Sequence, residues 1–284
     1  MEASTDQPLA ASPEAPPRWP WGFGFAAFLV ALLVTFLLAG IAAAVGGVEP
    51  GEKQPASFTI IATGIQDTAL VASAVLFAAL VARPRAWHFG LRRAPFWPAV
   101  GWAALGLVAF YLFAAIYGAI VQPDAEQRIT ESLGADRGTL GLIVAGCVVM
   151  ILAPLAEEVF FRGFFYASLR SRFGIITAAV VDGVVFGLVH FGFDGLDQLL
   201  ILPPLMVLGV IFCLVYEKTG SLWPVVGMHA FNNAVAYAVQ ADGGWQVSVV
   251  VGPLMIAAAM VAPRLLPPGP RALPVANPQP AAVR

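Results

Sequence analysis

Three short motifs place ionisable or polar side chains inside long apolar stretches of the chain. They are Glu157-Glu158-x-x-x-Arg162, Phe186-x-x-x-His190 and His229-x-x-x-Asn233. Two of the three histidines of the chain lie in these motifs. Because a charge at the centre of a bilayer costs about 2.5–3.5 kcal/mol, ionisable residues inside apolar spans are functional candidates. We therefore expect the three motifs to meet in one polar site.

Helix geometry indicates what such a site can do. Residues four positions apart share a helix face, so Glu158 is expected to pair with Arg162, whereas Glu157 points about 100° away and stays free. A rise of 1.5 Å per residue brings one Glu, two His and one Asn to a similar depth. A carboxylate and an imidazole can deprotonate water, while a second imidazole and an amide can donate hydrogen bonds to a developing oxyanion. These side chains suit a hydrolase.

The same side chains also suit a metal site. Glu157, His190 and His229 form a His2Glu set for Zn2+, with water as the fourth ligand and Glu158 or Asn233 behind them. The sequence does not decide between zinc-dependent and metal-free hydrolysis. An interpretation from another class is a non-catalytic membrane scaffold or a proton-coupled transporter that uses these polar residues as a relay.

Composition places the chain in a membrane. Of its 284 residues 59% are hydrophobic and 11% charged, and the mean hydropathy is +0.82, whereas soluble globular domains are about 45–50% apolar and about 25% charged. Fifteen basic residues against 17 acidic ones give no reason to expect a nucleic-acid partner. Two cysteines without a CxxC pattern exclude a disulfide framework.

Eight stretches are long and apolar enough for transmembrane helices, since about 20 such residues cross the hydrocarbon layer. They are residues 21–45, 58–81, 96–121, 139–169, 175–193, 199–216, 222–239 and 245–261. We therefore predict an all-α polytopic membrane protein of about eight transmembrane helices with an intramembrane polar cavity. Eight spans place 12 of the 15 basic residues on the side of the N-terminus, which predicts cytoplasmic termini. A lysine-poor composition rich in Ala, Gly and Pro favours a bacterial plasma membrane.

In this order along a multi-span chain, the three motifs resemble those of the CAAX-protease and bacteriocin-processing (CPBP, or Abi) family, which includes the type II CAAX prenyl endopeptidase. The resemblance covers about residues 139–240. It implies an all-helical intramembrane protease whose cavity opens toward the cytoplasmic side and admits a peptide end. Membrane lipid and a peptide or protein substrate, with or without a lipid, are the implied partners. Family members have been described both as metalloproteases and as glutamate-type proteases, so a Zn2+ cofactor stays open.

The resemblance also implies a role for each motif residue. Glu157 would activate water with His190, and His229 and Asn233 would form the oxyanion site. The supporting residues implied are Glu158, Arg162 and Phe186. Asp182 is outside the motifs, and it is expected to line the cytoplasmic approach to the cavity or to pair with Arg170 or Arg172.

The predicted organisation has five parts. A disordered cytoplasmic tail at residues 1–20 precedes a three-span membrane region at 21–138. The CPBP-like catalytic core follows at 139–240, the last transmembrane helix at 241–262, and a second disordered cytoplasmic tail at 263–284. The tails are assigned from their Pro and Ala content and their lack of apolar periodicity.

Overall fold

The computed structural model describes residues 17–49, 54–123, 129–192 and 196–265, and every regular element within these ranges is helical. The predicted all-α class is confirmed. The elements are α1 (Trp21–Gly46), α2 (Ala56–Ala79), η1 (Ala86–Phe89), α3 (Phe96–Val121), α4 (Ile129–Ser132), α5 (Gly138–Cys147), η2 (Val148–Leu152), α6 (Ala153–Phe160), η3 (Phe161–Tyr166), α7 (Ala167–Leu169), α8 (Ile175–Leu188), η4 (Leu196–Ile201), α9 (Leu202–Thr219), α10 (Leu222–Gln240) and α11 (Gly244–Leu265). The two predicted tails lie almost wholly outside the described residues.

Each of the eight predicted stretches contains a helix. In the described ranges six helical segments are long and apolar enough to cross a membrane. Helix α8 has only 14 residues. Helix α10 has 19 residues and is not among the six, because its polar residues lower its hydropathy. The chain is thus an all-α polytopic membrane protein, in which the shorter α8 and the more polar α10 lie beside six candidate spans.

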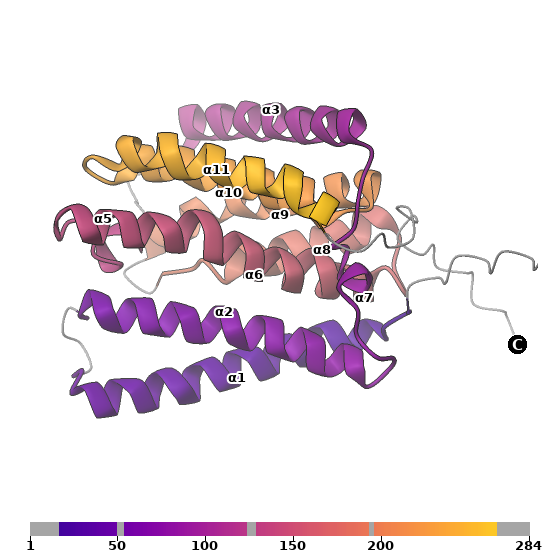
Figure 1. Cartoon of the computed structure of the whole chain (residues 1–284), viewed down its shortest axis with the longest axis horizontal. Helices are drawn as coiled ribbons and strands as arrows, with labels where there is room; N and C mark the ends of the chain where they lie inside the picture. The colour runs from indigo at the N-terminus through magenta and orange to yellow at the C-terminus, as the bar shows by residue number, and fades with distance from the viewer. Residues whose placement is uncertain (1–16, 50–53, 124–128, 193–195, 266–284) are drawn as a thin grey trace, which may run out of the picture.

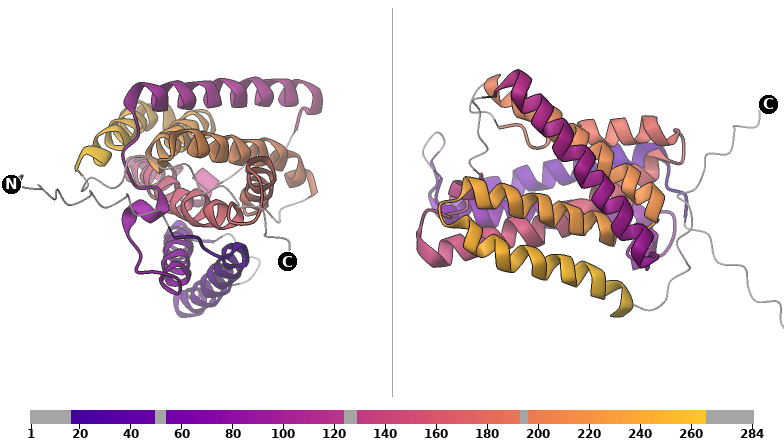
Figure 2. Two further views of the ribbon diagram at one scale, coloured as in Figure 1. Left: turned by 90° about the vertical axis from the view of Figure 1, so that its right-hand side faces the viewer. Right: turned by 90° about the horizontal axis from the view of Figure 1, so that it is seen from above.

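The helices lie in layers (Figure 1). The α1–α2 hairpin packs against α6 on one side of the molecule, and α3 packs against α9 and α10 on the other. Seen from above, α3 crosses obliquely over the helices beneath it (Figure 2). Many large apolar side chains of α1 and α3 point outward and are exposed, as expected of helices that face lipid. The polar motifs lie on the helices enclosed between these outer layers.

The segment Gly138–Leu169 is one long helix with two π-helical parts, η2 and η3, on either side of α6. A π turn inserts an extra residue into the helix and loosens its ladder of hydrogen bonds, and such turns occur frequently at functional sites. The glutamate motif therefore begins on a short α-helical piece between two irregular ones. Because π turns hold more residues per turn than an α-helix, side chains before and after η2 and η3 point in directions that a regular 3.6-residue period does not predict.

Helices α8 and α9 approach closely because glycines face each other. A Cβ atom on Gly183 would lie 2.6 Å from the carbonyl oxygen of Met206, and one on Gly209 would lie 2.7 Å from the Cα of Gly183. Small residues permit such contact between membrane helices. This contact brings the backbone of α9 within reach of Arg162, whose Nη2 donates to the carbonyl oxygen of Gly209 at 3.2 Å.

Several basic residues lie at one end of the molecule. Arg93 donates to the carbonyl oxygens of Pro263 and Arg264 at 2.8 and 2.9 Å, so the segment before α3 meets the end of α11. Arg92 donates to the carbonyl oxygen of Gly220, between α9 and α10. These contacts fix the helix ends on that side and gather positive charge there.

Candidate active site

Five ionisable side chains from three helical segments form a buried polar cluster at the centre of the helix assembly. We call Glu157, Glu158, Arg162, Asp182 and His229 the Arg162 cluster. Glu158, Arg162 and Asp182 have no exposed surface, and His229 and Glu157 are at most 9% exposed. The sequence prediction that the glutamate motif and the third motif meet is confirmed by these contacts.

Glu158 lies at the centre of the cluster. Its Oε1 accepts a hydrogen bond from Nη1 of Arg162 at 3.0 Å, which confirms the pairing predicted from the four-residue spacing. The same oxygen lies 2.8 Å from Nδ1 of His229. An ionised carboxylate only accepts hydrogen bonds, so Nδ1 of His229 carries the proton in this pair. The other ring nitrogen, Nε2, is then directed away from Glu158.

Glu157 lies beside that second nitrogen. Its Oε2 is 3.9 Å from Nε2 of His229 and, among the described residues, has no hydrogen-bond partner. Buried polar atoms are nearly always satisfied by protein or water, so this oxygen is an acceptor available to a small polar molecule. Glu157 also interacts electrostatically with Asp67, a buried residue of α2 with an unpartnered oxygen.

His190 lies just beyond the end of α8, not within a longer span as predicted. The helix ends at Leu188 because the chain tightens, with the amide of His190 donating to the carbonyl oxygen of Gly187. The imidazole Nδ1 is 2.7 Å from the carbonyl oxygen of Phe186, so Nδ1 donates and Nε2 is left as an acceptor. Between described residues no ion pair joins His190 to Glu157, so the pairing of these two is not formed directly.

Asn233 lies one turn after His229 on α10. Its Nδ2 donates to the carbonyl oxygen of Val149 at 2.9 Å, in the π-helical segment η2 where the backbone ladder is loosened. Asn232 donates to Oδ1 of Asn233 at 3.4 Å and lies 3.5 Å from the hydroxyl of Tyr111. Both amides are partly exposed, unlike the buried carboxylates. Asn233 is therefore more accessible than Glu158.

The prediction for Asp182 was wrong. Its Oδ1 lies 3.5 Å from Nε of Arg162 and accepts a hydrogen bond from the thiol of Cys213 at 3.1 Å. Neither Arg170 nor Arg172 pairs with it in the described contacts, and it is fully buried. The reason is that Asp182 faces α9 and η3, toward the middle of the assembly, and not toward the helix ends where those two arginines lie.

Aromatic rings enclose the charged groups. The guanidinium of Arg162 lies 4.3 Å from the ring centroid of Phe186 and 5.0 Å from that of Phe212. The His229 ring lies 5.2 Å from that of Phe212 and 5.9 Å from that of Phe186. Phe186 therefore supports both the arginine and the histidine, which gives its motif position a physical purpose.

The zinc interpretation gains no geometric support. Within the described ranges no group of three or more His, Cys, Asp or Glu side chains is arranged to hold a metal ion. Nδ1 of His190 and Nδ1 of His229 each face an oxygen acceptor. We therefore derive no reaction step through a metal.

A second buried group of charges lies at the end of the same long helix. Nε and Nη2 of Arg170 each lie 3.2 Å from an oxygen of Glu217, and the hydroxyl of Tyr166 donates to Glu217 at 2.9 Å. Nη1 of Arg170 donates to the carbonyl oxygen of Phe173 at 2.7 Å. We call these four residues the Arg170 cluster. It joins the end of α7 to α9 and lies outside the three motifs.

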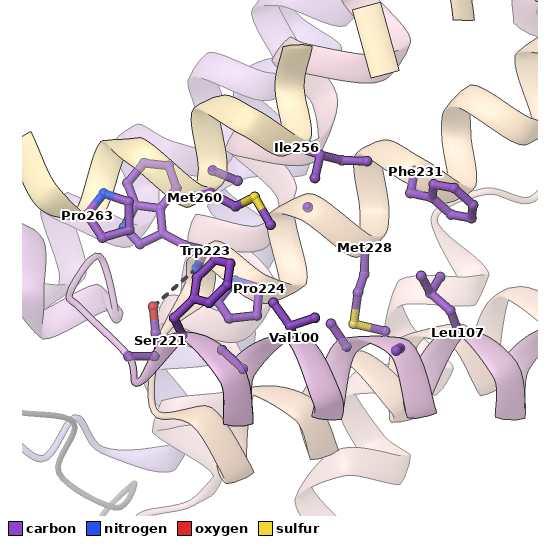
Figure 3. A pocket seen from close by; sticks show the side chains of 17 residues that line it. Val100, Leu107, Ser221, Trp223, Pro224, Met228, Phe231, Ile256, Met260 and Pro263 are labelled. Atoms are coloured by element: carbon purple, nitrogen blue, oxygen red, sulfur yellow. Dashed lines mark hydrogen bonds between the residues drawn. The ribbon is translucent and has the colours of Figure 1, made fainter. Parts of the chain in front are cut away.

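An apolar cavity of about 260 Å³ lies between α3, α10 and α11 (Figure 3). Its walls include Val100, Leu107, Met228, Phe231 and Ile256. At 100° per residue, the α10 residues that line it lie on the face opposite His229 and Asn233. The cavity is therefore separate from the Arg162 cluster and brings no titratable side chain to the chemistry.

The middle of the chain matches a known protein family. Residues 139–235 match the family model described as Rce1-like, type II CAAX prenyl endopeptidase. We call residues 139–235 the Rce1-like segment because of this similarity. It contains all three motifs, so the resemblance to the CAAX-protease family is confirmed over this part of the chain.

Curated relatives are distant and only partly covered. "Putative membrane peptidase YdiL" of Bacillus subtilis (strain 168) is 26% identical over 95 residues, which are 34% of this chain and 36% of that protein. An uncharacterized 24.3 kDa protein of Escherichia coli is 28% identical over 132 residues, 46% and 59% of the two chains. UPF0177 protein YxdF of Lactococcus lactis subsp. lactis (strain IL1403) is 28% identical over 96 residues, which are 34% of this chain and 50% of that protein. The matches thus span about a third to three fifths of these relatives, and no solved structure matches the chain.

Sequence reasoning missed two residues near the site. Asp67 is an acidic residue inside an apolar helix, and that signal alone marks it as a candidate. Tyr111 has a weaker signal, because a tyrosine in a membrane helix is common enough to pass unnoticed. Both come from the helices outside the Rce1-like segment, so the flanking layers also contribute groups to the site.

Proposed function

We propose that this protein is an intramembrane endopeptidase that hydrolyses a peptide bond near the membrane. The Rce1-like segment and the buried Arg162 cluster support this function. The observation that carries it is the relation between Glu157 and His229, with Oε2 of the carboxylate 3.9 Å from Nε2 of the ring. In the described part of the chain that oxygen accepts no hydrogen bond, and is thus free to receive one from water.

In the proposed reaction, a water molecule gives a proton to Glu157 as its oxygen attacks the carbonyl carbon of the scissile peptide. His190 keeps Nε2 as a second acceptor that orients this water. The C–N bond then breaks, and the proton held by Glu157 passes to the leaving nitrogen. The products are a carboxylic acid and an amine, and Glu157 returns to its starting state. General base catalysis of this kind contributes about 10²–10⁴-fold.

The developing oxyanion accepts hydrogen bonds from Asn233 and, when its Nε2 is protonated, from His229. Asn233 uses one amide proton on Val149 and has a second one to offer. Glu158 supports the reaction by fixing the orientation of the His229 ring, as an orienting carboxylate does in other hydrolytic sites. Arg162 in turn fixes Glu158.

We further propose that the basic end of the molecule faces the cytoplasm of a bacterium, so that both termini lie on that side of its plasma membrane. Basic loops are retained on the cytoplasmic side. At the basic end, Arg92 contacts the turn between α9 and α10, and Arg93 contacts the end of α11. On this proposal, the partners are membrane lipid and a peptide or protein whose cleaved bond reaches the bilayer. The cleavage experiment below decides whether the substrate must carry a lipid.

Cleavage of a peptide library by the purified full-length protein in lipid vesicles tests this proposal. The library contains peptides with farnesylated CAAX-like ends and the same peptides without the lipid, and products are detected by mass spectrometry. We expect products with the wild-type protein and none with Glu157→Gln. Product formation that is equal in the two proteins contradicts the proposed role of Glu157.

The same preparation separates a protease from a proton relay. Vesicles carrying a pH-sensitive dye report proton movement, and a relay predicts acidification that depends on Glu157 without any peptide product. Absence of cleavage by a folded wild-type protein, together with Glu157-dependent proton flux, would replace the protease with a transporter.

A further inference from the structure

Asp182 has a place in the Arg162 cluster that the three motifs do not account for. It lies on α8, is fully buried, and its Oδ1 is 3.5 Å from Nε of Arg162. Within the described residues, Nε of Arg162 makes no hydrogen bond, and Oδ2 of Asp182 has no partner. A buried charge is costly unless it is paired. Arg162 is therefore the cation that compensates Asp182, with help from the thiol of Cys213.

The charges show why this second carboxylate matters. Arg162 carries one positive charge and contacts two carboxylates, Glu158 at 3.0 Å and Asp182 at 3.5 Å. With Glu158 alone, the guanidinium and the carboxylate would neutralise each other, and Glu158 would have little charge left for His229. Asp182 takes up part of the positive charge of Arg162. Glu158 then remains a strong acceptor for Nδ1 of His229 at 2.8 Å.

Asp182 also fixes the plane of the guanidinium. Nη1 is held by Glu158 and Nη2 by the carbonyl oxygen of Gly209, and the flat face lies 4.3 Å from the Phe186 centroid. Asp182 is the group that faces the remaining nitrogen, Nε. Without it, the guanidinium can turn toward Glu158 and compete with His229 for Oε1.

We propose that Asp182 is a positioning residue that acts on His229 through Arg162 and Glu158. By sharing the arginine, it keeps Glu158 available to hold the histidine ring with Nε2 directed toward Glu157. The significance of this ring orientation for hydrolysis rests on the proposed function. The chain of contacts itself does not, so it can be tested without any substrate.

Nitrogen NMR of the histidines tests the chain of contacts directly. The full chain has only three histidines, so 15N-histidine labelling of the protein in lipid vesicles gives few signals, assigned with His88→Gln and His190→Gln. We expect Asp182→Asn to shift the Nδ1 resonance of His229. Glu217→Gln is the matched control, since it removes a carboxylate charge from the other buried arginine, and it should leave that resonance unchanged. An unshifted His229 signal in Asp182→Asn overturns the proposal.

A double variant that moves the carboxylate to a neighbouring residue distinguishes loss of the charge from misfolding. Sγ of Cys213 lies 3.1 Å from Oδ1 of Asp182, so Cys213→Asp combined with Asp182→Asn returns a carboxylate to nearly the same place beside Arg162. We expect this double variant to restore the wild-type His229 resonance. A role of Asp182 limited to its hydrogen bond with Cys213 predicts no restoration, and that result would also overturn the proposal.

The kinetic readout connects the contacts to catalysis. With the library peptide cleaved fastest by the wild type, we expect Asp182→Asn to lower kcat by about 10–100-fold, as loss of outer-shell partners does at other sites, with little change in KM. The double variant should recover most of this loss. A fall in kcat/KM that comes from KM alone contradicts a positioning role. If the wild type cleaves no peptide, the proposed function fails, while the His229 resonance still decides the role of Asp182.

Discussion

Two buried arginines, Arg162 within one long helix and Arg170 directly after its end, both pair with carboxylates but in different ways. Arg170 holds Glu217 through two nitrogens and uses a third on a carbonyl oxygen, and a tyrosine hydroxyl completes the set. Arg162 contacts two carboxylates, Glu158 and Asp182. We call the Arg170 cluster saturated because each guanidinium nitrogen and both oxygens of Glu217 have a hydrogen-bond partner. In the described residues, Glu157, Glu158 and Asp182 of the Arg162 cluster each keep one oxygen without a hydrogen-bond partner.

The difference teaches how to tell a structural ion pair from a reactive one. Charged groups whose polar atoms all have partners stabilise a helix contact and leave little for a ligand to bind. Unsatisfied buried oxygens cost free energy, so a fold keeps them where something binds or reacts. Burial and charge alone do not separate the two ion pairs, since Arg162 and Arg170 are both buried and the Glu217 side chain is only 10% exposed.

The largest expected effect comes from making the same substitution in each cluster. Glu158→Gln removes the acceptor that fixes the His229 ring, and we expect kcat to fall by about 10²–10⁴-fold. Glu217→Gln should leave kcat within about twofold of the wild type, because Glu217 contacts no group of the proposed reaction. Single-turnover cleavage of the library peptide measures both. Equal losses in the two variants would remove the distinction between the clusters.

A smaller effect is expected from the neighbouring asparagines of α10. Asn233→Ala removes the proposed oxyanion donor and should lower kcat by about 10²–10³-fold. Asn232→Ala is the matched control, because Asn232 touches Asn233 and Tyr111 only at 3.4 and 3.5 Å. We expect Asn232→Ala to keep most of the activity. A proton relay predicts that Asn233→Ala is tolerated, so an active Asn233→Ala protein would favour that alternative.

We expect the two clusters to differ in stability in the opposite direction, with the substitution in the Arg170 cluster lowering the free energy of unfolding more. Glu217→Gln weakens charge-assisted hydrogen bonds from Arg170 and Tyr166, and we expect the free energy of unfolding to fall by about 1.5–3 kcal/mol. Glu157→Gln replaces a carboxylate whose Oε2 has no partner, so it should leave stability unchanged or raise it. Thermal unfolding of the two variants in the same vesicles compares them. A protein destabilised more by Glu157→Gln than by Glu217→Gln contradicts the assignment of a saturated and an unsaturated cluster.

Much of this arrangement follows from the sequence. Apolar length predicts the helices, and the four-residue spacing predicts the Glu158 and Arg162 pair, because both depend on local geometry. The early end of α8 and the π-helical turns of η2 and η3 depend on packing between helices, which periodicity does not encode. The partner of Asp182 was missed for the same reason. Its choice of Arg162 over Arg170 follows from the close approach of α8 and α9 at Gly183 and Gly209.

The smallest expected effect concerns Asp67, which tests whether the unsaturated cluster extends beyond the Rce1-like segment. Asp67 lies on α2, is 8% exposed, and interacts with Glu157 through charge without a hydrogen bond between them. Asp67→Asn removes a negative charge that helps Glu157 hold the proton taken from water, so we expect kcat to fall by about two- to tenfold. Ser73→Ala is the matched control on the same helix, since the Ser73 hydroxyl donates to the carbonyl oxygen of Leu70, within α2 itself. Parallel kcat measurements on the two variants decide the matter: a loss confined to Asp67→Asn includes the α1–α2 hairpin in the site, and equal rates would limit the site to the helices that carry the three motifs.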